Sequence, residues 1–178
     1  MKKMTMVLAL AMLTGAAFAQ KKTTTSGTIT FDATTPGDAL PKAENKAAIA
    51  ALDTKAGTVA FESLVKNFSF SSARMQDHFN SPKWMDSEQF PKATFKGKIT
   101  NLGAVNFAKD GSYKANVEGD LTIHGITKPV STSATIVVKG GAINTNTEFT
   151  VKLADYALGN AGGKLADEPK ITVVAAFN

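Results

Sequence analysis

The sequence predicts an all-β protein built mainly from antiparallel strands that form a barrel or a sandwich. Apolar and polar residues alternate with a period of two over many short segments, which is the pattern of strands with one buried face. Short turns that contain glycine separate several of these segments. The 178 residues include no cysteine, so disulfides are excluded and a packed core must stabilise what we expect to be one domain.

The first residues are typical of a secretory signal peptide. A basic start, Met1-Lys2-Lys3, precedes an apolar core at residues 6–13 and a small-x-small cleavage pattern, Ala17-Phe18-Ala19. We therefore expect a signal peptide at residues 1–19 and a single domain at residues 20–178. The apolar core is too short for a permanent membrane helix and no later segment is long and uncharged, so we expect no membrane span in the mature chain.

The first half of the domain contains three predicted elements. Residues 29–33 alternate between apolar and polar side chains, which predicts the first strand. Residues 43–52 are rich in alanine and predict one short helix. Residues 59–70 predict a further strand, but the apolar side chains change parity midway, so we expect a β-bulge at residues 65–67.

The connection that follows, residues 71–91, breaks the two-residue period. Residues 73–79 predict a short helix. Ser81-Pro82 predicts the start of a second one, because serine is a favoured N-cap and proline suits the first helical position. We expect one or two short helices near residues 72–90.

The second half returns to the strand pattern. Residues 93–99 place apolar side chains on one face and lysines on the other, while Asp110-Gly111 and Gly140-Gly141 predict turns. Pairing of the first and last strands is one arrangement that would remove both edges of the sheet, and the closure order is left open. Long alternating runs predict the remaining strands at residues 113–123, 130–138, 149–153 and 171–177.

The charge of the chain argues against nucleic-acid binding. The formal net charge is +5, and Lys2 and Lys3 of the leader are part of it. The other positive charges are scattered lysines, with Arg74 as the single arginine. Proteins that read nucleic acids usually gather arginines on one face. We interpret the lysines as a solvated surface and expect no nucleic-acid partner.

The residue types needed for a metal or catalytic site are scarce. His124-Gly125 lies between two predicted strands, where glycine permits a positive φ, and we interpret it as a turn. The other histidine, His78, lies in the irregular connection, whereas a zinc site needs at least three converging ligands. No Gly-x-Ser-x-Gly motif is present. We expect no metal, no cofactor and no catalytic residue, and therefore not an enzyme.

Two long segments of the chain resemble the signature blocks of the YceI family. The first is MQDHFNSPKWMDSEQFPKATFKG at residues 75–97, and the second is VEGDLTIHGITKPV at residues 117–130. The end of the chain, LADYAL at residues 153–158 and LAD at 165–167, is also similar. One departure is that the family's usual Arg-Asp pair before the histidine is replaced by Met75-Gln76-Asp77-His78.

The resemblance implies an extended lipocalin-like antiparallel β-barrel, exported to the periplasm, that binds a long polyisoprenoid or related lipid chain inside. Gly97 and Gly119 on the inward parity would then leave space in the interior. Trp84 and Phe90, from the irregular connection, would form a lid at the mouth. The expected ligand-binding residues are these two lid residues and the strand residues that point inward by parity. The full set is Phe61, Phe68, Phe70, Trp84, Phe90, Phe95, Ile99, Val117, Leu121, Ile123, Ile136, Val138, Phe149 and Val151.

The expected function is to sequester or transport a polyisoprenoid or other long-chain lipid. Whether the protein forms a homodimer is left open. Two other classes also stay open. One is a hydrolase or isomerase that uses His124, or His78 with Asp77. The other is a partner-binding or stress-associated module whose filled core binds no ligand.

Overall fold

The computed structural model describes residues 21–39, 41–159 and 165–177, and the predicted signal peptide lies outside them. Within these ranges there is one α-helix, α1 (Ala73–Asn80), and three 3-10 turns at Val65–Asn67, Leu102–Ala104 and Leu153–Tyr156. The strands are β1 (Lys21–Asp32), β2 (Lys42–Asp53), β3 (Thr58–Leu64), β4 (Ser69–Phe70), β5 (Lys92–Ile99), β6 (Gly111–Ile123), β7 (Ile126–Lys139), β8 (Ala142–Thr150) and β9 (Lys170–Phe177).

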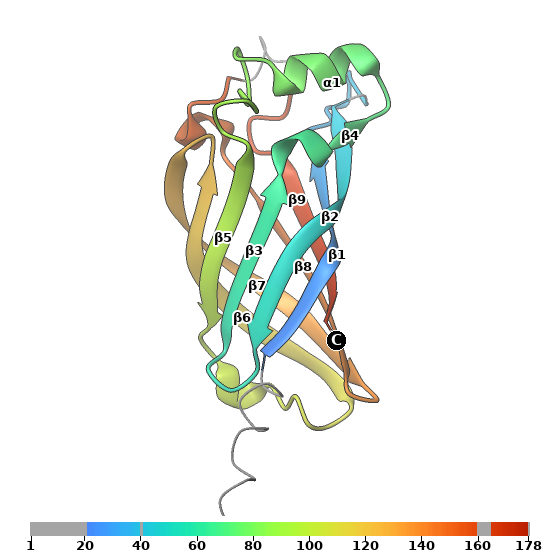
Figure 1. Cartoon of the computed structure of the whole chain (residues 1–178), viewed down its shortest axis with the longest axis vertical. Coiled ribbons are helices and arrows are strands. Elements are labelled where there is room, and N and C mark those ends of the chain that lie inside the picture. The colour runs from blue at the N-terminus through green and yellow to red at the C-terminus, as the bar shows by residue number, and fades with distance from the viewer. Residues whose placement is uncertain (1–20, 40, 160–164, 178) are drawn as a thin grey trace, which may run out of the picture.

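Eight of these strands close into an antiparallel barrel, which α1 covers at its upper end (Figure 1). The order around the ring is β1, β9, β8, β7, β6, β5, β3 and β2, and β2 pairs back with β1. β1 also pairs with β9, so the first and last strands are joined in the closed ring. The short β4 extends the sheet at the start of β2. The predicted all-β barrel is therefore the observed architecture.

The predicted helix at residues 43–52 is wrong, because this segment forms β2. Its buried side chains are Ala43, Asn45, Ala48, Ala50 and Leu52, which follow the period of a strand with one interruption. The backbone pairs with β1 on one side and with β3 and β4 on the other. These ladders outweigh the weak intrinsic preference of alanine for helix, which is only a few tenths of a kcal/mol per residue.

The predicted β-bulge at residues 65–67 is also wrong. A 3-10 turn lies there instead, and it lets β3 and β4 pair with different parts of β2. Register shifts occur in the β1–β2 hairpin, between Thr24 and Gly27 and between Gly27 and Ile29. Shifts of this kind bend and twist the paired strands locally.

Two further local predictions are corrected. Residues 81–85 form turns rather than a second helix, and the Ser81 hydroxyl donates to the His78 carbonyl at the end of α1 (2.7 Å). Serine thus caps the end of one helix rather than the start of another. Asp110-Gly111 is not a hairpin turn, because residues 100–110 form a longer connection in which Asp110 Oδ1 accepts from Gly140 N (2.9 Å).

The strand predictions for the second half agree well with β5, β6, β7 and β9. Gly140 and Gly141 form the expected turn, with φ values of 57° and 82°. β8 ends at Thr150, earlier than predicted, because Val151 N donates to Pro169 O (3.1 Å) and Leu153 begins a 3-10 turn.

Buried apolar side chains form two clusters inside the barrel. The upper cluster lies below α1 and contains Phe79 and Trp84, whereas the lower cluster contains Ile143 and Phe177 at the opposite end. Phe95 packs against both clusters. No helix among the described residues has the length and apolar character needed to cross a membrane.

Candidate ligand cavity

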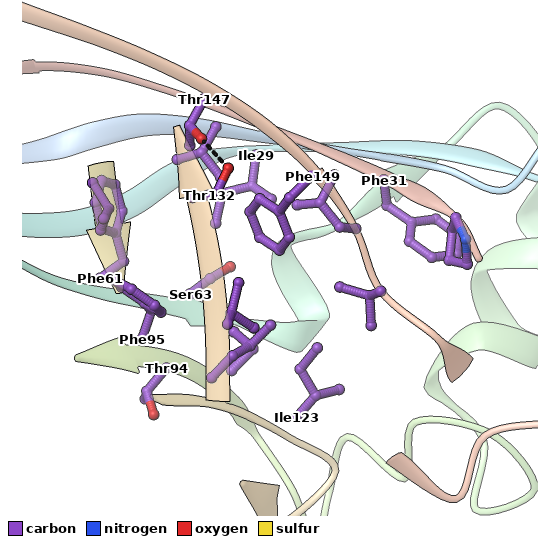
Figure 2. Close-up of a pocket in the computed structure, with 18 of the residues that line it drawn as sticks. Ile29, Phe31, Phe61, Ser63, Thr94, Phe95, Ile123, Thr132, Thr147 and Phe149 are labelled. Atoms are coloured by element: carbon purple, nitrogen blue, oxygen red, sulfur yellow. Dashed lines mark hydrogen bonds between the residues drawn. The ribbon is translucent and has the colours of Figure 1, made fainter. Parts of the chain in front are cut away.

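The barrel encloses a cavity of about 180 Å³ between the two clusters (Figure 2). One buried water needs roughly 10–15 Å³ of such space, so the interior is hollow rather than filled. Side chains from all eight barrel strands line the cavity, and none of the lining residues in the described part of the chain is charged. A wall of this kind favours an apolar occupant.

Most of the predicted site residues lie around this cavity. Phe70, Phe90 and Val138 are not part of the lining. Phe70 packs on Phe79 above the cavity, with ring centroids 4.9 Å apart, and Val138 belongs to the lower cluster. The residues that do line it are Phe61, Phe68, Trp84, Phe95, Ile99, Val117, Leu121, Ile123, Ile136, Phe149 and Val151.

Five aromatic side chains pack against one another at the upper end of the cavity, and we call them the aromatic cap. Neighbouring rings within it have centroids 4.9–6.5 Å apart, mostly in tilted or edge-to-face contacts, which aromatic pairs favour. Trp84 is fixed by a hydrogen bond from its Nε1 to the Gly159 carbonyl (3.0 Å). The cap consists of Phe31, Phe68, Phe70, Phe79 and Trp84.

Phe90, the other predicted lid residue, lies outside the cavity lining. Its ring contacts the His124 ring edge-on, at a centroid distance of 4.6 Å. His124 and Gly125 join β6 to β7 with φ values of 50° and 72°, and His124 Nδ1 lies 3.2 Å from the Tyr156 carbonyl oxygen. His124 therefore lies in the turn between β6 and β7, as the sequence predicts, and from there it contacts Phe90 and Tyr156 in two other connections.

The described residues provide no group of three His, Cys, Asp or Glu side chains that could hold a metal ion. His78 and Asp77 lie on the exposed surface of α1, and neither they nor His124 contribute to the cavity lining. The histidines are thus not brought to the hollow part of the molecule.

Gly97 and Gly119 were expected to leave empty space in the interior, but the ring of Phe95 fills that space. Gly97 and Gly119 pair across β5 and β6. A Cβ atom at Gly97 would lie 2.6 Å from Phe95 Cζ, and one at Gly119 would lie 2.7 Å from the same atom. The Phe95 ring occupies the space beside the two glycines, so it lies along the barrel wall.

Sequence reasoning missed several lining residues. Ile29 and Phe31 alternate in the first predicted strand, so parity could have identified them. Phe79, Met85 and Leu158 lie in the helix and loops above the barrel, where a two-residue period gives no signal. Polar residues also line the cavity, namely Ser63, Thr94, Thr132, Thr145 and Thr147.

Comparison with known proteins places this barrel among its relatives. A UPF0312 protein of Pseudomonas fluorescens is 32% identical over 104 residues, which cover 47% of this chain and 52% of the relative. Protein YceI of Escherichia coli O157:H7 is 25% identical over 107 residues, which cover 57% of this chain and 52% of the relative. The chain spans about half the length of these curated relatives.

A solved structure gives the same fold over a larger part of the chain. It is a polyisoprenoid binding domain from Saccharophagus degradans implicated in plant cell wall breakdown, with a TM-score of 0.75 and 13% identity. The match covers 89% of this chain and 98% of that domain.

The family model of the YceI-like domain matches residues 11–177, which is nearly the whole chain. The sequence blocks, the closed eight-stranded barrel and this match agree, and the chain belongs to the YceI-like domain family.

Proposed function

We propose that this protein is an exported, non-catalytic carrier that binds a long isoprenoid-type or related lipid chain inside its barrel and works in the periplasm. The observation that carries the proposal is the hollow interior, which is lined on all sides by uncharged and mostly apolar side chains. The solved relative described as a polyisoprenoid binding domain supports the choice of ligand class. The basic and apolar leader in residues 1–19 supports export.

The binding energy would come from removing hydrocarbon from water. Each buried methylene contributes roughly 0.8 kcal/mol, so an isoprene unit contributes roughly 3–4 kcal/mol before the lost freedom of its rotatable bonds is subtracted. A few buried units therefore suffice for useful affinity. The protein's part would be to keep water away from the bound chain, and the packed rings of the aromatic cap would contribute to this at the upper end.

The test is uptake of a fluorescent long-chain probe by two tryptophan variants of β7. Val130 lines the cavity, whereas its neighbour Ser131 is exposed on the outer face. We expect Val130→Trp to fill the cavity and reduce uptake at least tenfold, while Ser131→Trp binds like the natural protein. Both variants are first checked for a cooperative thermal transition.

Native mass spectrometry of protein purified from its own host provides a second measurement. We expect a bound lipid that is lost in Val130→Trp. A ligand-free spectrum, together with no probe uptake by the natural protein, would contradict the carrier function.

A further inference from the structure

Ser63 brings a polar group into the apolar wall of the cavity. It lies on β3, is only 2% exposed and lines the cavity, and Figure 2 shows its side chain among those that surround the hollow space. A buried hydroxyl without a full set of hydrogen bonds is unfavourable in such surroundings. The partners of Ser63 therefore indicate what the cavity is built to hold.

Asn45 determines which role the Ser63 hydroxyl has. Asn45 Nδ2 donates to Ser63 Oγ (2.8 Å) and to the Leu64 carbonyl (3.0 Å), and Asn45 Oδ1 accepts from Ala47 N (2.9 Å). The opposite orientation of the amide would set Oδ1 against a carbonyl and Nδ2 against an N–H group. The orientation is thus fixed, and Ser63 Oγ is an acceptor toward Asn45.

The hydrogen of the Ser63 hydroxyl has no acceptor among the described residues, since the contact with Asn45 is its one hydrogen bond there. Thr132 and Thr147, which also line the cavity, differ in this respect. Their Oγ1 atoms lie 3.1 Å apart. Thr132 Oγ1 can donate to the Glu148 carbonyl (3.3 Å), and Thr147 Oγ1 can donate to the Ser133 carbonyl (3.0 Å). Both threonines can direct their hydrogens to the backbone, as can Thr145, whose Oγ1 donates to the Ala175 carbonyl (3.4 Å), whereas the hydrogen of the buried Ser63 is left for the cavity.

We propose that Ser63 is an anchoring point inside the barrel that donates a hydrogen bond to an uncharged oxygen of the bound lipid. The inference rests on the proposed function and specifies the ligand class: a long chain with a neutral carbonyl, ether or hydroxyl oxygen in its buried part. A charged head group would find no opposite charge there, because the lining contains none. The oxygen-bearing part of the ligand therefore lies within the barrel.

The experiment compares two probes of the same shape: a long-chain methyl ketone, and the alkene in which a CH₂ group replaces the carbonyl oxygen. Each probe displaces a fluorescent chain from the natural protein and from Ser63→Ala. We expect the natural protein to prefer the ketone by about three- to tenfold, as one net hydrogen bond allows. Ser63→Ala loses this preference but binds the alkene as before.

Ser131→Ala is the matched control, because it removes a hydroxyl on the exposed outer face of β7, and it keeps the preference. If Ser63→Ala does not fold, Ser63→Cys replaces it, since a thiol is a much weaker donor and we expect it to lose most of the preference. Equal binding of both probes by the natural protein, or a preference that survives in the Ser63 variants, overturns the anchoring role while the carrier function stands. Failure of the natural protein to bind either probe overturns the carrier function itself.

Discussion

Asn45 is fully buried in the barrel wall, yet both ends of its amide are hydrogen-bonded. It satisfies Ala47 N at the register shift of the first hairpin and also holds Ser63 on the neighbouring strand. A polar residue in a core stabilises the fold only when all such partners are present. Asn45 therefore serves both the bend of the hairpin and the geometry of the cavity wall.

Replacing Asn45 with alanine tests this role. Because Ala47 N, the Leu64 carbonyl and Ser63 Oγ lose their partner, we expect the free energy of unfolding to fall by about 2–4 kcal/mol. Urea denaturation gives the measurement. Asn144→Ala, on the exposed face of β8, is the control and changes the value by no more than about 0.5 kcal/mol. Similar values for the two variants would disprove the role of Asn45.

Asp32 gives a pH-dependent prediction. Its Oδ1 accepts from the Thr34 hydroxyl (2.7 Å) and from Thr34 N (3.2 Å), and its Oδ2 lies 3.3 Å from Lys42 Nζ. The hydrogen bond from the Thr34 side chain is the main cause that lowers the pKa of Asp32, and burial opposes it. Since the folded pKa lies below the unfolded one, this stabilisation is present above about pH 4 and is lost as the pH falls through the folded pKa.

We therefore expect Asp32→Asn to lower the free energy of unfolding by about 1 kcal/mol at pH 7. The difference between variant and natural protein shrinks as the pH falls below about 4. Urea denaturation at a series of pH values measures both quantities. A difference that stays constant down to pH 2 would show that the ionised carboxylate is not the stabilising form.

The parity of the strands predicted most of the site residues, because a strand in a barrel wall points every second side chain inward. Leu121 and Phe149 are examples that need no other information. Parity could not exclude Val138, which also points inward but lies below the cavity. It also gave no indication of Ser63 as an anchoring point, since that role depends on Asn45, a residue distant in sequence.

Among the elements, the pair β5–β6 has no room for a side chain at the facing glycines Gly97 and Gly119. A Cβ atom at Gly119 would lie 2.4 Å from the Lys96 carbonyl oxygen and would also meet the Phe95 ring. A side chain there must either separate the two strands or push Phe95 toward the cavity. The two glycines thus influence both the stability of the wall and the width of the interior.

Gly119→Ala is expected to lower the free energy of unfolding by about 1–3 kcal/mol, because even a methyl group overlaps its neighbours. We also expect weaker uptake of a long-chain probe, since the displaced Phe95 ring narrows the cavity. Thermal unfolding and probe titration give the two values. Gly103→Ala is the control, because a Cβ at that position has no neighbour within 4 Å. An unchanged Gly119→Ala protein would refute the close approach.

The element that sequence analysis misjudged most is β2. Five consecutive positions on its inward face include three alanines, and alanine is the best helix former. The strand forms because β1 and β3 offer backbone partners on both sides, and these partners are not visible in the segment itself. The β5 and β6 segments were predicted correctly because each has strict alternation and residues of high strand propensity.

At the scale of the whole molecule, the closed ring is the central feature. Regular strand spacing predicted a barrel or a sandwich, and the family resemblance selected the barrel. The pairing of β1 with both β2 and β9 gives it a paired neighbour on each side over residues 29–32. Removing a backbone N–H from a strand that is paired on both sides breaks a hydrogen bond of the ladder and destabilises the sheet.

Thr30→Pro tests the closure. Thr30 faces Glu44 on β2 and Thr172 on β9, so proline removes a donor from a strand that is paired on both sides. We expect a loss of about 3 kcal/mol or more in the free energy of unfolding, measured by urea denaturation. Thr30→Ala, which keeps the backbone donor, loses less than about 1 kcal/mol. Equal effects of the two substitutions would mean that the side chain rather than the ladder matters.

For the lipid carrier proposed above, the absence of charge from the described lining has a consequence for how the lipid chain would be loaded and released. Ions in solution screen attractions between charges, but they have little effect on the transfer of hydrocarbon out of water. Occupancy is then governed by a partition between the barrel and any neighbouring lipid bilayer. Such a protein fills or empties according to the hydrocarbon available around it, and changes in ionic strength leave that balance nearly untouched.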